Sequence, residues 1–322
     1  MDVFYLTLSQ MLTMVLIILA GYMLRKANIL PEETHLVLSR LETFVFIPAL
    51  NVVTWVKNCN TNTLMANSSL IFYGALIIGI ALVIAYILAL VFVPKAKTPD
   101  EKYQRNIYKY AFTFGNFGFL GNFMVLGIWG DEVFFKYSML TLLTAFVCSS
   151  WGLIILIPKG QGKVISFRNM IKLIFTPPII GLGVGMVLGL LNLNSYVPGF
   201  VQNSLQTAAN CMGPVAMLLS GFVIGGYNLK SLLVNKKVYL ATAFRLIIIP
   251  AFIIGVLKLI GANETIISLS LIALATPFGM NTIVYPAAYG GDFRTGASMN
   301  IISNVISVIT IPLMYLLFVV IL

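Results

Sequence analysis

The feature that most constrains the fold of this chain is a stretch of 57 consecutive residues without a charged side chain, between Lys172 and Lys230. In the whole chain, hydrophobic residues make up 59% and charged residues only 9%, whereas a soluble domain carries about 25% charged residues. Water solvates such a surface poorly. The sequence therefore predicts an all-α integral membrane protein whose surface faces lipid.

Ten apolar segments are each long enough to cross a bilayer as a helix, which takes about 20 residues. The first segment lacks the basic start and the Ala-x-Ala cleavage site of a secretory signal, so we expect it to be a retained helix. A turn-rich patch at residues 192–199 separates the sixth segment from the seventh. The predicted spans are residues 4–24, 37–56, 70–93, 107–129, 133–157, 171–191, 204–226, 238–260, 265–290 and 297–320.

Lysine and arginine fall mainly in alternate loops. Of the 20 such residues, 16 lie in loops on one side of the predicted spans, three lie on the other side, and Arg245 lies within the eighth span. Because basic loops stay in the cytoplasm, we expect a multi-pass protein of the cytoplasmic membrane with both termini outside. The net charge of +10 then reflects this topology, and we expect no nucleic-acid partner.

Two of the uncharged stretches are interrupted by Asn, Gly and Pro, where a membrane helix is normally continuous. One contains GNFGFLGN at residues 115–122, and the other contains TPFGMN at residues 276–281. Each stretch ends in Gly-Asp, and the aspartates Asp131 and Asp292 lie half of the 322-residue chain apart. A matched pair of interrupted hydrophobic segments indicates the binding site of a transporter.

Five predicted spans in each half mean that the two halves enter the membrane from opposite sides. We therefore expect a 5+5 inverted repeat, with residues 1–160 as the first five-helix unit and residues 161–322 as the second. Pro48 and Pro214, each in the second span of its half, are a further match between the halves. In this arrangement the interruptions lie in spans four and nine.

The interruptions predict a site for an anion near the middle of the membrane. A helix broken in hydrocarbon leaves backbone groups unpaired, at a cost of several kcal/mol, unless protein or a water-filled cavity covers them. The half-helices that restart after each break point their positive N-terminal ends inward, and Asn side chains add donors and acceptors. The candidate substrate-binding residues are Asn116, Gly121, Asn122, Pro277, Asn281 and Tyr285.

Several of these residues also fit a purely structural role. Close helix packing alone would also explain the glycines of the first interruption, Gly115, Gly118 and Gly121. We expect such a packing face for Gly181, Gly185 and Gly189, which lie four residues apart. Arg245 is expected to extend toward the membrane surface or to pair with Glu42, and an alternative role is to attract anions. All ten acidic residues are expected in loops or near span ends, which disfavours a buried proton relay.

The same sequence gives little support to an enzyme. Three scattered cysteines and a single His35 provide no metal-ligand pattern, so we expect neither a metal nor another cofactor. The motif GxxxxGK[ST] is absent from the sequence, so we expect transport to be secondary rather than driven by ATP.

The interrupted stretches resemble those of the auxin efflux carrier family. Residues 115–121, followed by Gly130-Asp131-Glu132, resemble its Asn-x-Gly-Phe-x-Gly-x-Pro stretch, and residues 277–281 with residues 289–292 resemble its second crossover. The resemblance covers the whole chain. It implies a ten-helix inverted repeat, similar to the bile-acid sodium symporters, in which a crossover domain moves like an elevator against a scaffold.

The resemblance also implies a substrate class and site positions. Bacterial members are associated with small carboxylates such as malate and malonate, and plant members with indole-3-acetate. Asn116, Pro277 and Asn281 occupy crossover positions of the family. Two departures are Asn122, where the family usually has Pro, and Pro286, where it more often has Ala.

The leading hypothesis is a secondary transporter of small organic anions in the lipid bilayer, and the resemblance makes a homodimer plausible. A sodium-coupled symporter of the bile-acid type is one alternative. A membrane sensor that binds its ligand without moving it is another, although the short loops leave little room for an output module.

Overall fold

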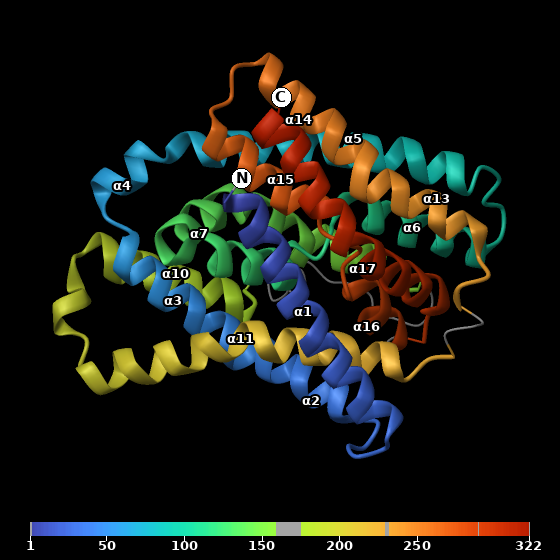
Figure 1. Cartoon of the computed structure of the whole chain (residues 1–322), viewed down its shortest axis with the longest axis horizontal. Coiled ribbons are helices and arrows are strands. Elements are labelled where there is room, and N and C mark those ends of the chain that lie inside the picture. The colour runs from blue at the N-terminus through green and yellow to red at the C-terminus, as the bar shows by residue number, and fades with distance from the viewer. Residues whose placement is uncertain (1, 159–174, 229–231, 289, 322) are drawn as a thin grey trace.

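The computed structural model describes residues 2–158, 175–228, 232–288 and 290–321, and within these ranges it contains helices and no strand (Figure 1). Its elements are α1 (Asp2–Lys26), α2 (Thr34–Leu41), η1 (Glu42–Phe46), α3 (Ile47–Asn58), α4 (Thr61–Ala66), α5 (Ser68–Phe92), α6 (Pro99–Thr113), η2 (Phe117–Gly121), α7 (Asn122–Val147), η3 (Cys148–Gly152), α8 (Leu153–Ile155), α10 (Pro177–Leu190), η4 (Leu193–Tyr196), α11 (Gly199–Gly225), α13 (Lys236–Ala243), η5 (Phe244–Ile248), α14 (Ile249–Leu259), α15 (Glu264–Ala275), α16 (Asn281–Ala288), α17 (Arg294–Tyr315) and η6 (Leu316–Ile321).

Seven helical stretches of the described residues are long and apolar enough to cross a membrane, and two further apolar helices are shorter. This agrees with an integral membrane protein, but ten separate spans are not confirmed. The predicted boundary between the halves, at residues 160 and 161, and the start of the predicted span 171–191 lie outside the described residues. The seven are Phe4–Lys26, Thr34–Asn58, Ser68–Phe92, Phe117–Ile155, Gly199–Gly225, Lys236–Leu259 and Arg294–Ile321, and the shorter two are Pro177–Leu190 and Glu264–Ala275.

The interrupted stretches explain most of the difference from the predicted spans. The predicted span 107–129 is divided, because α6 ends at Thr113 and helical structure resumes only at Phe117. From there one stretch of 39 residues continues through the predicted fifth span, with its helical geometry broken at Gly130, where φ is 76°. The predicted span 265–290 divides likewise into α15 and α16.

The outward-facing side chains of the long helices are apolar. Leu16 on α1 is 68% exposed, and Phe72 and Val83 on α5 are 66% and 61% exposed. Water would make this surface costly, since each square ångström of apolar area stabilises a protein by about 25 cal/mol when it is removed from water. The arrangement fits helices whose outer faces contact lipid.

Helix starts in the loops follow standard capping rules. At the start of α6, the Thr98 side chain accepts a hydrogen bond from the Glu101 N–H, the Glu101 carboxylate accepts one in return, and Pro99 occupies the first turn. The backbone N–H groups of Thr98 and Lys97 lower the pKa of the Glu101 carboxyl by hydrogen bonding to its charged form. The Asn263 side chain caps α15 by accepting from the Ile266 N–H.

The helices form two groups, and the first consists of α1, α2, α3, α10 and α11. Within it, α3, α10 and α11 lie together at the lower left of Figure 1. A methyl group at Gly181, Gly185 or Gly189 of α10 would overlap the backbone of α3, so these glycines form the packing face that their spacing predicts. Gly221 of α11 meets the backbone of α1 in the same way.

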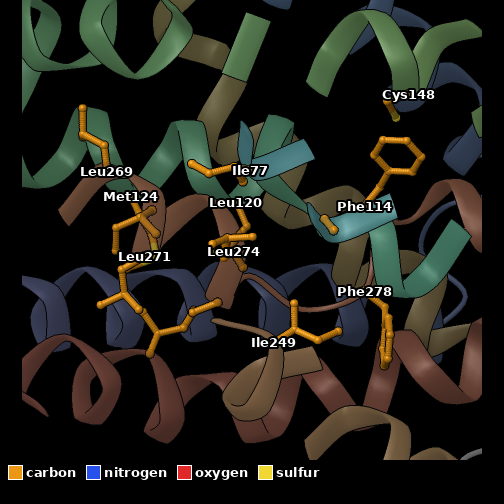
Figure 2. Close-up of a cluster of buried hydrophobic side chains, with 14 of the residues drawn as sticks. Ile77, Phe114, Leu120, Met124, Cys148, Ile249, Leu269, Leu271, Leu274 and Phe278 are labelled. Carbon is orange, nitrogen blue, oxygen red and sulfur yellow. The ribbon is translucent and has the colours of Figure 1, made fainter. Parts of the chain in front are cut away.

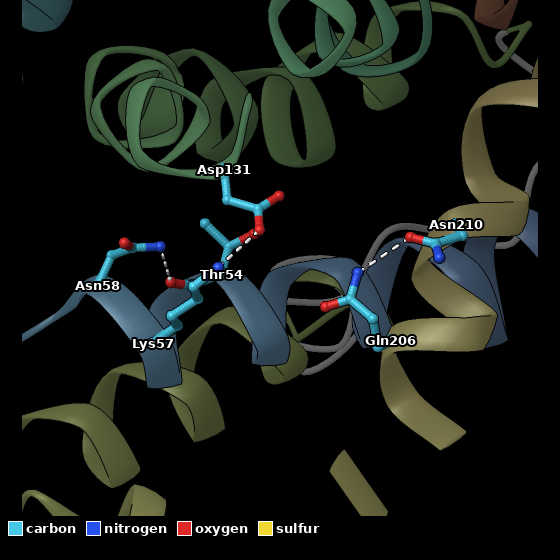
Figure 3. Close-up of polar contacts among 6 residues, drawn as sticks. All are labelled: Thr54, Lys57, Asn58, Asp131, Gln206 and Asn210. Carbon is cyan, nitrogen blue, oxygen red and sulfur yellow. Dashed lines mark hydrogen bonds and ion pairs between the residues drawn. The ribbon is translucent and has the colours of Figure 1, made fainter. Parts of the chain in front are cut away.

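The second group consists of α5, α6, α7, α13, α14, α15, α16 and α17 and carries most of the buried core. Figure 2 shows a part of this core, where Ile77, Met124 and Leu274 come from three different helices. The helix α7 contacts both groups. Directly after the break at Gly130 of α7, Asp131 forms an ion pair of 3.0 Å with Lys57 of α3, which joins the groups (Figure 3).

Candidate functional site

The two predicted interruptions meet each other in space. The chain is extended between α6 and η2 and again between α15 and α16. Gly115 and Phe278 face each other in an isolated antiparallel bridge, and the Asn116 N–H donates a hydrogen bond of 2.8 Å to the Pro277 carbonyl. Each break thus satisfies part of the backbone that the other leaves free, as a low-dielectric interior requires.

A buried arginine joins the helices that end at the two breaks. The Arg245 Nε donates to the Thr276 carbonyl at 3.2 Å, and its Nη1 donates to the Phe112 carbonyl at 3.1 Å. These carbonyls lie at the C-terminal ends of α15 and α6, which carry negative partial charge. One guanidinium therefore stabilises both helix ends at the point where they stop.

Two of the three predicted roles of Arg245, reaching the membrane surface and pairing with Glu42, were wrong. Its side chain does not reach the surface, because Arg245 is only 1% exposed. It does not pair with Glu42 either, since its hydrogen bonds go to backbone carbonyls and no ion pair of the described residues includes it. Both partners are distant in the sequence, 31 and 133 residues away, so spacing alone did not reveal them.

Gly115 leaves the space that the guanidinium occupies. A methyl group at this position would overlap the guanidinium of Arg245 and the hydroxyl of Thr276. Beside them lies a cavity of about 20 Å³ whose polar lining includes Thr113, Thr141 and Arg245. That volume holds about one water molecule and is far below the roughly 300 Å³ of a small-molecule site. A small organic molecule would fit here only if the surrounding helices moved apart.

Side chains of α17 hold the second break in place. The Asn300 Nδ2 donates to the Phe278 carbonyl at 2.9 Å, and the Phe278 N–H donates to the Ser303 hydroxyl at 3.1 Å. Both side chains are fully buried. They were not among the predicted site residues, although a signal was present: Asn300, Ser303, Asn304 and Ser307 form a polar stripe at helical spacing in an apolar segment.

Asn116 lies at the first break, as predicted. It is 3% exposed, and its carbonyl accepts from the N–H groups of Leu120 and Gly121 at 3.0 and 3.1 Å, which starts η2. Among the described residues its side-chain amide has no hydrogen bond. A buried amide in this state retains its capacity to bind a ligand.

Asn281 begins α16, directly after the second break. Its Nδ2 donates to the Tyr110 hydroxyl of α6 at 2.8 Å, and that hydroxyl lies 3.1 Å from the Cys148 Sγ. The partner of Asn281 is 171 residues away in the sequence, so Tyr110 and Cys148 were not among the predicted site residues. Tyr285 follows on the same face of α16 and is half-buried.

The remaining predicted residues, Pro277, Gly121 and Asn122, have different surroundings. Pro277 is buried and takes part through its carbonyl. Gly121 is buried against Tyr137, whose hydroxyl donates to the Phe117 carbonyl at 3.0 Å, so Gly121 makes room for a contact that stabilises η2. Asn122, at the start of α7, is half-buried and has no side-chain hydrogen bond among the described residues.

Comparisons with known proteins agree with this arrangement. A family model described as "Membrane transport protein" matches residues 6–315. An uncharacterized transporter of Methanocaldococcus jannaschii is 28% identical over 308 residues, which covers 94% of this chain and 96% of that protein. An uncharacterized transporter of Methanothermobacter thermautotrophicus is 24% identical over 304 residues, covering 94% and 95% of the two chains.

The match covers nearly the whole chain, including both breaks and the spanning helices around them. The chain therefore belongs to the membrane transport protein family, the auxin efflux carrier family that its interrupted stretches resemble, and is a membrane transporter.

Proposed function

We propose that the protein is a secondary transporter that moves small organic anions, carboxylates such as malate or malonate or auxin-like acids, across the cytoplasmic membrane. The observation that carries the proposal is the meeting of the two breaks around a buried guanidinium. Arg245 is 1% exposed and, among the described residues, has no acidic partner. A positive charge in such a place favours a negative ligand nearby.

The groups around the breaks suit a carboxylate. Carboxylate oxygens accept hydrogen bonds, and donors are available from the Asn116 amide and from the N-terminal ends of η2 and α16, which also carry positive partial charge. The C-terminal ends of α6 and α15 carry negative partial charge, and Arg245 already donates hydrogen bonds to them. The partial charge that the site offers to a ligand is therefore positive.

The proposed architecture is the ten-span inverted repeat, with residues 1–160 and 161–322 as its halves, the two breaks as crossovers and both termini outside the cell. The pairing of Asn116 with Pro277 supports it, because crossovers in related halves meet near the centre. We further propose an elevator motion in which the second helix group moves against the first. We assign the first group as the scaffold in this proposal.

The test measures uptake of radiolabelled malate and malonate into proteoliposomes while the sodium gradient and the pH gradient are varied in turn. We expect Asn116→Ala to abolish uptake while insertion and folding stay normal, because its amide has no structural hydrogen bond to lose. The matched control is Asn62→Ala on the peripheral helix α4, where the residue is exposed. Wild-type uptake by Asn116→Ala would remove this residue from the site.

One observation favours the sodium-coupled alternative. Buried oxygens of Asn304 and Ser270, on α17 and α15, have no hydrogen-bond partner among the described residues, and amide and hydroxyl oxygens are ligands of hard cations. Replacing sodium with choline in the same uptake assay separates a sodium-coupled symporter, which would lose uptake, from a sodium-independent transporter, which would keep it. Binding of malate without any uptake, detected as thermal stabilisation of the protein, would instead support the sensor alternative.

A further inference from the structure

Glu42 is a fully buried carboxyl group inside a predicted membrane-spanning helix. It is 0% exposed, and neither of its carboxyl oxygens has a hydrogen-bond partner among the described residues. Other acids of the described chain differ from it: Glu32, Asp131 and Glu132 each pair with a basic residue and are at least 36% exposed. Glu42 is thus the one buried acid in this part of the protein.

The burial of Glu42 departs from the sequence-based expectation. The helix begins at Thr34, so a rise of about 1.5 Å per residue places Glu42 about 12 Å along the candidate spanning stretch. The expected position in the first turns of a span argued against a buried proton site, but the Glu42 side chain is fully buried by protein.

No cation among the described residues stands next to this carboxyl group. Its turn, η1, packs against α2, α3, α10 and α11. The titratable or charged side chains on these helices are His35 and Arg40 of α2, Lys57 of α3 and Cys211 of α11, and α10 has none. Arg40 is exposed, His35 contacts the Glu32 carbonyl, and Lys57 is paired with Asp131.

Cys211 does not compensate a charge on Glu42, because its Sγ–H donates to the Thr207 carbonyl of its own helix. An isolated ionised carboxylate is strongly disfavoured in such surroundings, and the group takes up a proton instead. The described conformation therefore holds Glu42 as a neutral carboxylic acid.

The helix that carries Glu42 also borders the second helix group. Leu38, one turn earlier on the same helix face, packs against an apolar cluster that includes Leu219 of α11 together with Met280 and Ile283 of the second group. Met280 and Ile283 stand on either side of Asn281 in the chain. Glu42 is also the first residue of a π-helical turn, a feature that often occurs at functional sites.

We propose that Glu42 is a proton-binding site whose protonated form is required for the second helix group to move past the first. The proposal rests on the transport function proposed above. In the step itself, a proton from water bonds to one carboxylate oxygen of Glu42 when the packing of α10 and α11 over its turn loosens, and the same bond breaks when the proton returns to water. The ionised form cannot stay packed beneath α10 and α11, so it displaces the helix along which the second group moves.

The test compares malate exchange by the full-length protein in proteoliposomes with the same pH inside and outside. We expect the wild-type exchange rate to fall by about tenfold per pH unit once Glu42 is mostly ionised, since one pH unit changes the protonated fraction tenfold. Glu42→Gln, a neutral mimic of the acid, should exchange malate at a rate without this decline. Glu33→Gln, at an exposed acid just before the same helix, should keep the wild-type pH profile.

A second measurement needs no transport. Infrared spectra of the purified protein in lipid should contain the carbonyl stretching band of a protonated carboxylic acid at neutral pH, and the band should be lost on raising the pH and in Glu42→Gln. An unchanged band, or a pH profile that Glu42→Gln shares with the wild type, would overturn the proposal. If the wild-type protein moves no malate, the proposed function is contradicted. The infrared band then tests separately whether Glu42 binds a proton.

Discussion

Two spanning stretches of this protein are built alike and differ in the charge that they bury. Thr34–Asn58 and Lys236–Leu259 each consist of a helix of eight residues, a π-helical turn of five residues and a second helix with Pro in its first turn. Glu42 is the first residue of one π-helical turn, and Arg245 is the second residue of the other. Among the described residues, these are the only buried side chains of the charged types.

The difference between the two lies in their partners. Arg245 has two backbone carbonyls as acceptors, and a guanidinium stays charged inside proteins. Glu42 has no partner in the described chain, and a carboxyl group can become neutral. The same local construction thus supports either a fixed charge that holds two helix ends or an acid that responds to pH. The hydrogen-bond partners of the buried side chain determine which of these two roles it has.

Neutralising both residues in turn should produce the strongest contrast in stability. Arg245→Gln leaves the Phe112 and Thr276 carbonyls without their donor, at about 1–3 kcal/mol for each buried group. Glu42→Gln changes a neutral acid to a neutral amide of the same shape, so we expect less than about 1 kcal/mol. The measurement is the thermal unfolding midpoint in detergent. Equal losses in the two variants would mean that Glu42 is charged and held by a partner, and the two stretches would then be alike.

The next largest effect on stability is expected from filling the space beside the Arg245 guanidinium. Gly115→Ala places a methyl group against the guanidinium and the Thr276 hydroxyl, and overpacking of this kind costs about 1–3 kcal/mol. Gly118→Ala, three residues away, meets nothing within 4 Å and is the matched control. We expect a lower unfolding midpoint and slower malate uptake only for Gly115→Ala. Identical behaviour of the two variants would show that the guanidinium does not need this space.

Some of these features could be predicted from the sequence and others could not. Composition predicts the membrane class, because it depends only on which solvent the surface tolerates. The breaks near Asn116 and Asn281 are predictable as well, since Gly, Pro and Asn weaken a helix wherever they stand. What the breaks contact was not predictable: Asn281 meets Tyr110 across 171 residues, and Arg245 meets Phe112 across 133 residues.

Glu42 shows a different limit. From the sequence, an acid in the first turns of an apolar segment looks like a residue at the membrane surface. Its burial depends on α11 and α10 packing over its turn, and that packing is set in part by glycines such as Gly185 and Gly221. The local pattern around Glu42 contains no information about these distant residues. The polar stripe of α17 is the opposite case, because its helical spacing is visible in the sequence alone.

The weakest effect on stability concerns the ion pair that joins the two helix groups at the surface. Lys57 and Asp131 lie 3.0 Å apart, with side chains 59% and 36% exposed (Figure 3), and pairs in such positions contribute about 0.2–1 kcal/mol. Lys57→Ala should therefore change the unfolding midpoint little, and less still at high salt. Lys136→Ala removes a pair of 3.1 Å within α7 alone and is the control.

The same two variants also test the elevator motion. Because the Lys57 pair connects the groups and the Lys136 pair does not, faster malate exchange in Lys57→Ala but not in Lys136→Ala is the expected sign that α3 and α7 separate during transport. Equal exchange rates in the two variants would mean that these helices stay together. The contact of Leu38 with the apolar cluster around Met280 would then be the sliding contact to test next, since there the helix that carries Glu42 packs beside the second group.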